Sequence, residues 1–169
     1  MPYFCTDTDL LAREPAIFLE SAFAHQALLK DAAGTVAGTT LTLTSGPLAT
    51  PGVLPGMVAQ LTTVDGALTQ LAEIVALDGP AQATISALRG RNADPAIAPL
   101  TQNAVKVTIV TFRPQIAAAG DALLAAVGVA SDRDSAAHPA YADLTGFGPA
   151  CGFAALAAIF RTLTASPHA

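Results

Sequence analysis

Charged residues are scarce in this sequence, and their scarcity limits what the protein can bind. Only 12% of the 169 residues are charged and 52% are hydrophobic, whereas about 25% of a typical soluble domain is charged. Lys30 and Lys106 are the only lysines, and the net charge is −5. Because no basic stripe is available to neutralise phosphates, we do not expect the protein to grip nucleic acid.

The sequence also lacks a segment typical of a membrane span or a secretion signal. The apolar run at residues 146–160 is too short to cross a bilayer and contains glycine and proline. The N-terminal residues Met1 to Phe4 lack the charged stretch and the long apolar stretch of a signal peptide. We therefore expect a soluble, non-secreted protein with no membrane partner.

Cysteine is rare, and the two cysteines lie at opposite ends of the chain. Cys5 and Cys151 could pair, but in an intracellular protein we interpret them as free and partly buried. Cys151 follows Pro149 at an expected helix start, where the pKa of a thiol can be lowered. No histidine lies near it in the sequence, so we interpret Cys151 as a small buried residue.

The three histidines form no recognisable metal or catalytic motif. His25 is expected on a packed helix face, His138 precedes a proline in a turn, and His168 lies in the C-terminal tail. Asp132 and Asp134 have a spacing found in calcium loops, but no third ligand follows at a fitting position. We interpret them as part of a solvated loop.

Two arginines, Arg89 and Arg91, flank Gly90 and could meet a carboxylate or a phosphate of a partner. We interpret them as a solvated hairpin tip. With no other candidate in the chain, the sequence predicts no catalytic residue, no cofactor site and no metal site. We therefore expect a protein that is not an enzyme.

The pattern of apolar residues is clearest in a block from Leu54 to Arg89. It reads as successive short strands with turns at Asp65-Gly66 and Asp78-Gly79-Pro80. The segment between these turns is also compatible with a helix, but the close turns favour a strand. Five strands are predicted in all, at residues 39–44, 57–63, 68–77, 82–88 and 104–111, and they suggest a small barrel or a twisted antiparallel sheet.

Helices are predicted on both sides of these strands, at residues 7–13, 16–30, 114–127 and 149–164. Thr6 and Asp9 have the spacing of a capping box, and Pro15 can occupy a first helical turn. In the last helix, Phe153, Leu156, Ala157, Phe160 and Leu163 form an apolar face. A second face consists of the small residues Gly152, Ala154, Ala155 and Ala158, and such faces let another helix approach closely.

The order of these elements predicts an α+β protein. N- and C-terminal helix pairs would form a helical bundle, and the five-stranded barrel or sheet would be an insertion. The predicted helical domain comprises residues 1–34 and 112–169, and the inserted β domain comprises residues 35–111. The shortage of charge has two compatible explanations, an alanine-rich sequence from a GC-rich genome and a surface buried against other subunits.

Both ends of the chain resemble a known family. Residues Tyr3 to Leu11 (YFCTDTDLL) resemble the opening Thr/Asp-capped helix of tailed-phage head–tail connector (adaptor) proteins. Residues Ala154 to Leu163 (AALAAIFRTL) resemble the last helix of that family, where an alanine-rich stretch leads to an Ile–aromatic pair. The β block is a departure from the mostly helical pattern of the family.

The resemblance implies a structural virion protein that is assembled in the host cytoplasm. Its partners would be copies of itself in a homo-oligomeric ring of about 12 subunits, the portal protein, and tail or stopper proteins. DNA would pass through the ring without sequence-specific binding, and a net negative charge suits such a conduit. The alternative is a small β-barrel module that binds a peptide or small ligand at the loops of residues 46–55 and 90–103.

Overall fold

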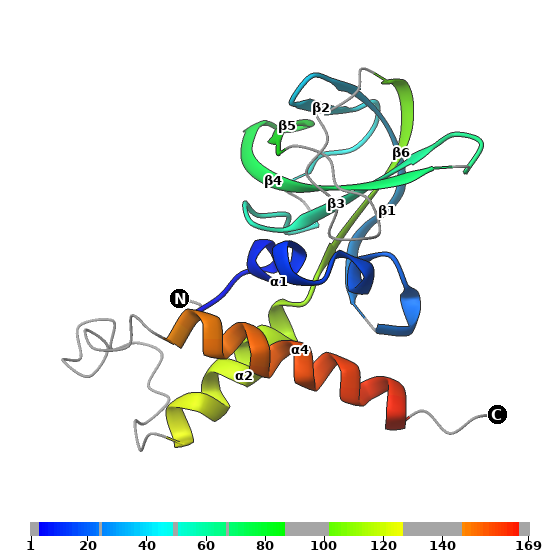
Figure 1. The fold of residues 1–169 in the computed structure, drawn as a ribbon. Helices are drawn as coiled ribbons and strands as arrows, with labels where there is room; N and C mark the ends of the chain where they lie inside the picture. Colours follow the sequence, from blue (N-terminus) through cyan, green and yellow to red (C-terminus); the bar gives the residue numbers. More distant parts are fainter. Residues whose placement is uncertain are drawn as a thin grey trace.

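The computed structural model of the chain describes residues 4–23, 25–48, 51–66, 68–86, 102–126 and 147–165. These residues form a β-barrel that stands on a layer of helices (Figure 1). The helices come from both ends of the chain, and the strands come from its middle. The two parts meet along one side of the barrel, where α1 (Asp7–Arg13) lies (Figure 1).

The barrel has six antiparallel strands. They are β1 (Gln26–Ala37), β2 (Thr40–Leu43), β3 (Val58–Thr63), β4 (Thr69–Gly79), β5 (Gln82–Ile85) and β6 (Gln102–Thr111). The order around the barrel is β1-β2-β5-β4-β3-β6, and pairing of β1 with β6 closes it. Closure gives every strand two neighbours, so the sheet has no open edge along which another chain could pair.

The predicted fold class is therefore wrong. The protein is a closed six-stranded antiparallel barrel with a few short helices, not a helical bundle with a five-stranded insertion. The error lies in residues 16–30, which were expected to be a helix. They form two short 3-10 turns, Pro15–Phe18 and Ser21–Phe23, and then enter β1 at Gln26.

Irregular pairing explains why β1 is not visible in the sequence. Its register with β6 shifts three times between Ala27 and Val36, and each shift breaks the alternation of inward and outward residues that identifies a strand. At one of these irregularities Asp31 has a φ of 50°, and its N–H donates to Oγ1 of Thr108 at 3.1 Å. The predicted domain boundary between residues 34 and 35 falls inside this strand.

Several other elements agree with the sequence pattern. The first helix has the predicted bounds, Asp7–Arg13, and the N–H of Thr6 donates to Oδ2 of Asp9 at 2.7 Å, as the capping spacing predicts. The strands β2 to β6 and the helices α2 (Arg113–Ala126) and α4 (Phe147–Ala165) begin within two residues of the predicted positions. The strand interpretation of residues 68–77 is confirmed by β4.

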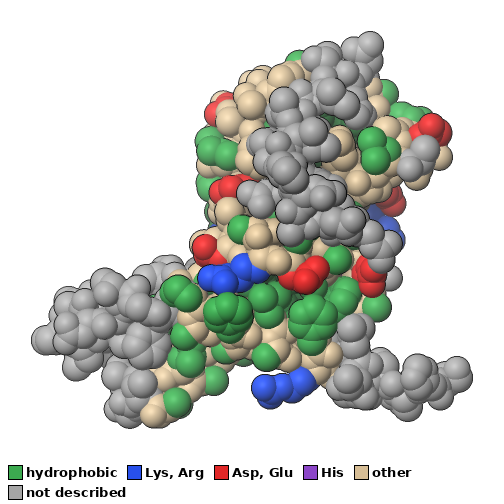
Figure 2. Space-filling view, viewed as in Figure 1, with side chains coloured by type: hydrophobic (Ala, Val, Ile, Leu, Met, Phe, Trp, Pro, Cys, Tyr) green, Lys and Arg blue, Asp and Glu red, His purple; other side chains and the backbone are tan. Residues whose placement is uncertain are grey.

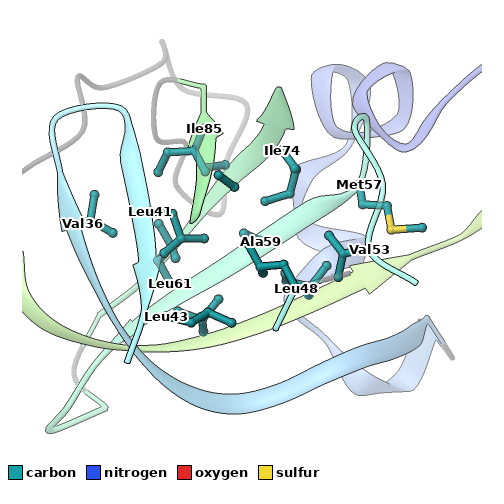
Figure 3. Close-up of a cluster of buried hydrophobic side chains, with 14 of the residues drawn as sticks. Val36, Leu41, Leu43, Leu48, Val53, Met57, Ala59, Leu61, Ile74 and Ile85 are labelled. Atoms are coloured by element: carbon teal, nitrogen blue, oxygen red, sulfur yellow. The ribbon is translucent and has the colours of Figure 1, made fainter. Parts of the chain in front are cut away.

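The inside of the barrel is filled with apolar side chains. Figure 3 shows part of this core, with Val36, Leu41, Leu43, Leu48, Val53, Met57, Ala59, Leu61, Ile74 and Ile85 labelled. Leu48 and Val53 come from the segment between β2 and β3, and they lie together with Met57 at one side of the cluster (Figure 3). The lumen is thus a packed core, as in other small barrels.

A second core lies between the barrel and the helices. Here Val58, Leu71 and Val110 point outward from β3, β4 and β6, while their neighbours in sequence, such as Ala59 and Ile109, belong to the lumen core. The helical side of this second core is provided chiefly by Leu10, Leu11, Ile17, Phe18, Phe112, Ile116, Cys151, Ala155 and Ile159. Parts of β3, β4 and β6 are therefore buried on both faces.

Gly34 gives a direct test of how tightly the barrel closes. A Cβ atom at this position would lie 2.9 Å from the carbonyl oxygen of Thr42 and 2.9 Å from Cγ2 of Val107. We expect Gly34→Ala to lower the free energy of unfolding by about 1–3 kcal/mol in urea denaturation, because the neighbouring strands must move apart. At Gly79 the nearest atom to a new Cβ would be 3.9 Å away, so Gly79→Ala is a matched control with an expected effect within about 0.5 kcal/mol. Equal effects of the two substitutions would contradict the tight closure.

Candidate functional site

Few of the residues considered from the sequence lie in the described parts of the chain. Arg89, Arg91, Asp132, Asp134, His138 and His168 are outside the described residues. His25 precedes β1, so the prediction that it lies on a helix face is wrong. Its ring is half-buried against Phe112, with the ring centroids 6.0 Å apart, and burial lowers the pKa of the imidazole. It packs against the second core and has no carboxylate or thiol partner among its described contacts.

Within the described ranges, no group of three or more His, Cys, Asp or Glu side chains is placed to hold a metal ion. None of the described helices combines the length and the apolar character that a membrane span requires.

Asp7 is the most buried carboxylate among the described residues, with 1% of its surface exposed. It lies in the first turn of α1, but its partners are 104 and 105 positions away. Oδ2 accepts a hydrogen bond from Oγ1 of Thr111 at 2.5 Å, and Oδ1 accepts one from the N–H of Phe112 at 2.6 Å. The carboxylate thus fixes α1 to the junction where β6 ends and α2 begins.

Burial dominates the electrostatics of this contact. It raises the pKa of Asp7 from 3.8 to about 6, although the hydrogen bonds from Thr111 and Phe112 and the charge of Arg113 oppose the rise. Thr111 also accepts a hydrogen bond from the N–H of Arg113 at 3.0 Å, so the same group of residues orders the first turn of α2. This arrangement holds the helices on the barrel.

An apolar face of α4 is partly exposed, although the ring of Phe160 also packs edge-to-face against Phe23, with the ring centroids 5.4 Å apart. Phe153 and Phe160 are 61% and 42% exposed, and Ala157 lies exposed between them in the sequence. The guanidinium carbon of Arg13 lies 4.6 Å from the centroid of the Phe153 ring, a cation–π geometry. Figure 2 shows hydrophobic side chains gathered on the helical layer, with basic side chains above and below them and acidic ones on the barrel side. We call Phe153, Ala157 and Phe160 the α4 face.

The opposite side of α4 carries small residues, and it is the side that packs inside the protein. Cys151, Gly152 and Ala155 are buried there. In α2, a Cβ atom on Gly120 would come within 4.0 Å of Sγ of Cys151, so the two helices approach closely. Gly152 and Ala155 of the expected small-residue face are thus used within the chain, whereas of the expected large apolar face Phe153, Ala157 and Phe160 are exposed and Leu156 packs against the second core.

A second exposed apolar group lies on the barrel. Val64 and Leu68, in the turn between β3 and β4, are 59% and 46% exposed, and Val75 on β4 is 48% exposed. Residues 58–86, which include β3, β4 and β5, contain three acidic residues, Asp65, Glu73 and Asp78, and no lysine or arginine. We call Val64 and Leu68 the barrel patch. It is apolar, and the acidic Asp65 lies in the same turn.

An open cleft of about 310 Å³ lies between β1, the loop before β3 and the start of α2. Its lining is mostly apolar, with Leu28, Leu54 and Met57, and Arg113 is the one charged residue in it. Nη2 of Arg113 donates to the carbonyl oxygen of Pro55 at 3.3 Å, which ties the loop to α2. The loop of residues 46–55, expected to form a ligand site, contributes Gly52 and Leu54 to this cleft, whereas residues 90–101 are outside the described residues.

Comparison with known proteins finds no family model that matches this chain, and no curated protein or solved structure that is similar to it. The case for a function therefore depends on the surfaces and residues described above.

The raised pKa of Asp7 predicts a pH-dependent stability. Because the folded protein holds this proton more tightly than the unfolded chain, the contribution of Asp7 is fully present below pH 3.8 and is lost as the pH rises through about 6. Asp7→Asn keeps an acceptor for Phe112 but does not titrate. The quantity to compare is the free energy of unfolding of the native protein minus that of Asp7→Asn, measured by urea denaturation. We expect this difference to fall by about 3 kcal/mol from well below pH 3.8 to well above pH 6.

Thr111→Val provides a second variant for the same test. It removes a hydrogen bond that lowers the pKa of Asp7, so we expect the pH-dependent loss of stability to occur at higher pH. Parallel pH curves for the native protein and Asp7→Asn would contradict a buried, titrating carboxylate.

Proposed function

We propose that the protein is a non-enzymatic structural subunit that assembles with further copies of itself into a ring, as a head–tail connector subunit of a tailed-phage virion would. The observation that carries this proposal is the exposed α4 face. It leaves Phe153 and Phe160 partly exposed on a helix whose other side is buried in the second core. Exposed groups of large apolar residues mark interaction surfaces in soluble proteins.

A second copy of the chain is the partner that the charges favour. Arg161 is the only charged residue of α4, and Arg13 lies against Phe153. The barrel patch combines exposed Val64 and Leu68 with the acidic Asp65 in the same turn. An apolar surface with acidic charge on one copy therefore complements an apolar surface with basic charge on the next.

Contact between two different surfaces generates a ring or a filament. When the α4 face of one copy binds the barrel patch of the next, each copy still has one surface of each kind available, so the assembly grows until it closes. The low content of charged residues, 12%, is in keeping with surfaces buried in permanent interfaces. The resemblance of both chain ends to connector proteins supports the proposal that this ring lies between the portal and the tail and that DNA passes through it.

Mixing two variants tests this arrangement directly. We expect Phe153→Asp to disable the α4 face and Val64→Asp to disable the barrel patch, because each places a charge in a contact that excludes water. Both side chains are largely exposed in one subunit, so the fold should change little in stability. Each variant alone should be a monomer by light scattering after gel filtration, and an equal mixture should form one-to-one dimers.

The mixture also distinguishes contact between the α4 face and the barrel patch from symmetric contact between two α4 faces. If the α4 face bound another α4 face, Val64→Asp alone would form dimers and Phe153→Asp would never join them. That result, or unchanged assembly of both variants, would contradict contact between the α4 face and the barrel patch.

A small-ligand module is a second candidate, favoured by the cleft of about 310 Å³ with Arg113 in its apolar lining. Such a cleft suits a small apolar anion. Titration with benzoate, followed by nuclear magnetic resonance, should then shift the methyl signals of Leu28 and Leu54, and the shifts should disappear in Arg113→Gln. Absence of any shift at millimolar benzoate would remove this candidate.

A further inference from the structure

The two cysteines of the chain lie in contact. Sγ of Cys5 and Sγ of Cys151 are 3.4 Å apart, although the residues are 146 positions apart in the sequence. Cys5 precedes α1 and is 2% exposed, while Cys151 lies in the first part of α4 and is fully buried. Both thiols are free in this structure, as expected from the sequence.

The surroundings hold the two sulfur atoms together. Both belong to the second core. Within it, Sγ of Cys151 also lies 3.8 Å from the carbonyl oxygen of Ile116. A disulfide has a sulfur–sulfur length of about 2.0 Å, so the bond requires only a small further approach of two side chains already in contact.

We propose that Cys5 and Cys151 are a redox-modifiable pair that a hydroperoxide converts into an internal disulfide. This inference is independent of the proposed ring assembly, because it depends only on the contact between two thiols within one chain.

The hydrogen bond between the thiols gives them different roles. Cys5 donates to Cys151, and this bond lowers the pKa of Cys151 while burial opposes the change; the same bond, together with burial, raises the pKa of Cys5. Cys151 is therefore the thiol that more readily becomes the thiolate, which is the nucleophilic form.

The reaction balances in two steps. The thiolate of Cys151 attacks one oxygen of the hydroperoxide, so that a sulfur–oxygen bond forms, the oxygen–oxygen bond breaks, and hydroxide (or alkoxide) takes up the thiol proton and leaves. Sγ of Cys5 then attacks the resulting sulfenic acid; a sulfur–sulfur bond forms and water leaves with the Cys5 proton. Overall, two thiols are oxidised and one hydroperoxide is reduced. A thiol reductant reverses the modification by exchange.

The disulfide would close a loop that contains almost the whole chain. It would join the segment before α1 to the helix that carries the α4 face, across the second core. Because a cross-link over a long loop restricts the unfolded chain, the oxidised protein should unfold at a higher temperature, by about 5–10 °C.

The test uses the full-length protein, reduced and then treated with hydrogen peroxide. We expect its intact mass to fall by two hydrogens, the two thiols titratable in denaturant to disappear, and the midpoint of thermal unfolding to rise; addition of dithiothreitol should reverse all three changes. Cys5→Ser and Cys151→Ser are matched controls, which should show neither the mass loss nor the rise in unfolding temperature.

The native protein alone decides the outcome if a serine variant fails to fold. Retention of both titratable thiols after peroxide treatment would overturn the proposal. So would oxidation that adds oxygen without forming an internal bond, or cross-linking only between separate chains.

Discussion

The fold depends on burying parts of three strands on both faces. In β3, β4 and β6, residues that point into the lumen, such as Ala59 and Ile109, alternate with residues that point toward the helices, such as Val58 and Val110. Without α1, α2 and α4, the second set would form an apolar sheet face in water. Without the lumen core, the barrel could not stay closed. The helices and the barrel are therefore parts of one packed unit, and the hydrogen bonds from Thr111 and Phe112 to Asp7 fix them together where β6 leaves the barrel.

Much of the local structure could be predicted from the sequence, because its signals are local. The capping residues Thr6 and Asp9 mark α1, and the Asp-Gly turns separate β3, β4 and β5. The segment Gln26–Ala37 could not be predicted in this way. Its bulges break the alternation, and its pairing with β6 depends on residues 66 to 85 positions away. Without this strand, the sequence pattern indicates an insertion between helix pairs. With it, the six strands form a closed barrel.

In the candidate site too, features with local signals could be predicted, and features that depend on distant residues could not. The two faces of α4 follow from its helical periodicity, and Phe153 and Phe160 share the expected apolar face. Which face would remain in solvent could not be predicted, because that depends on the close approach of α2 at Gly120. The contacts between Asp7 and Thr111 and between Cys5 and Cys151 join residues more than a hundred positions apart. No local pattern in a single sequence encodes such contacts.

We propose that a further copy of the chain covers the exposed parts of Phe153 and Phe160. The mass of the unmodified protein in solution tests this claim most directly. Native mass spectrometry at micromolar concentration should show a discrete oligomer whose size does not change on further concentration, as a closed ring requires. A protein that remains a monomer over the same concentration range, and is not incorporated into a larger particle when its partners are present, would contradict the claim.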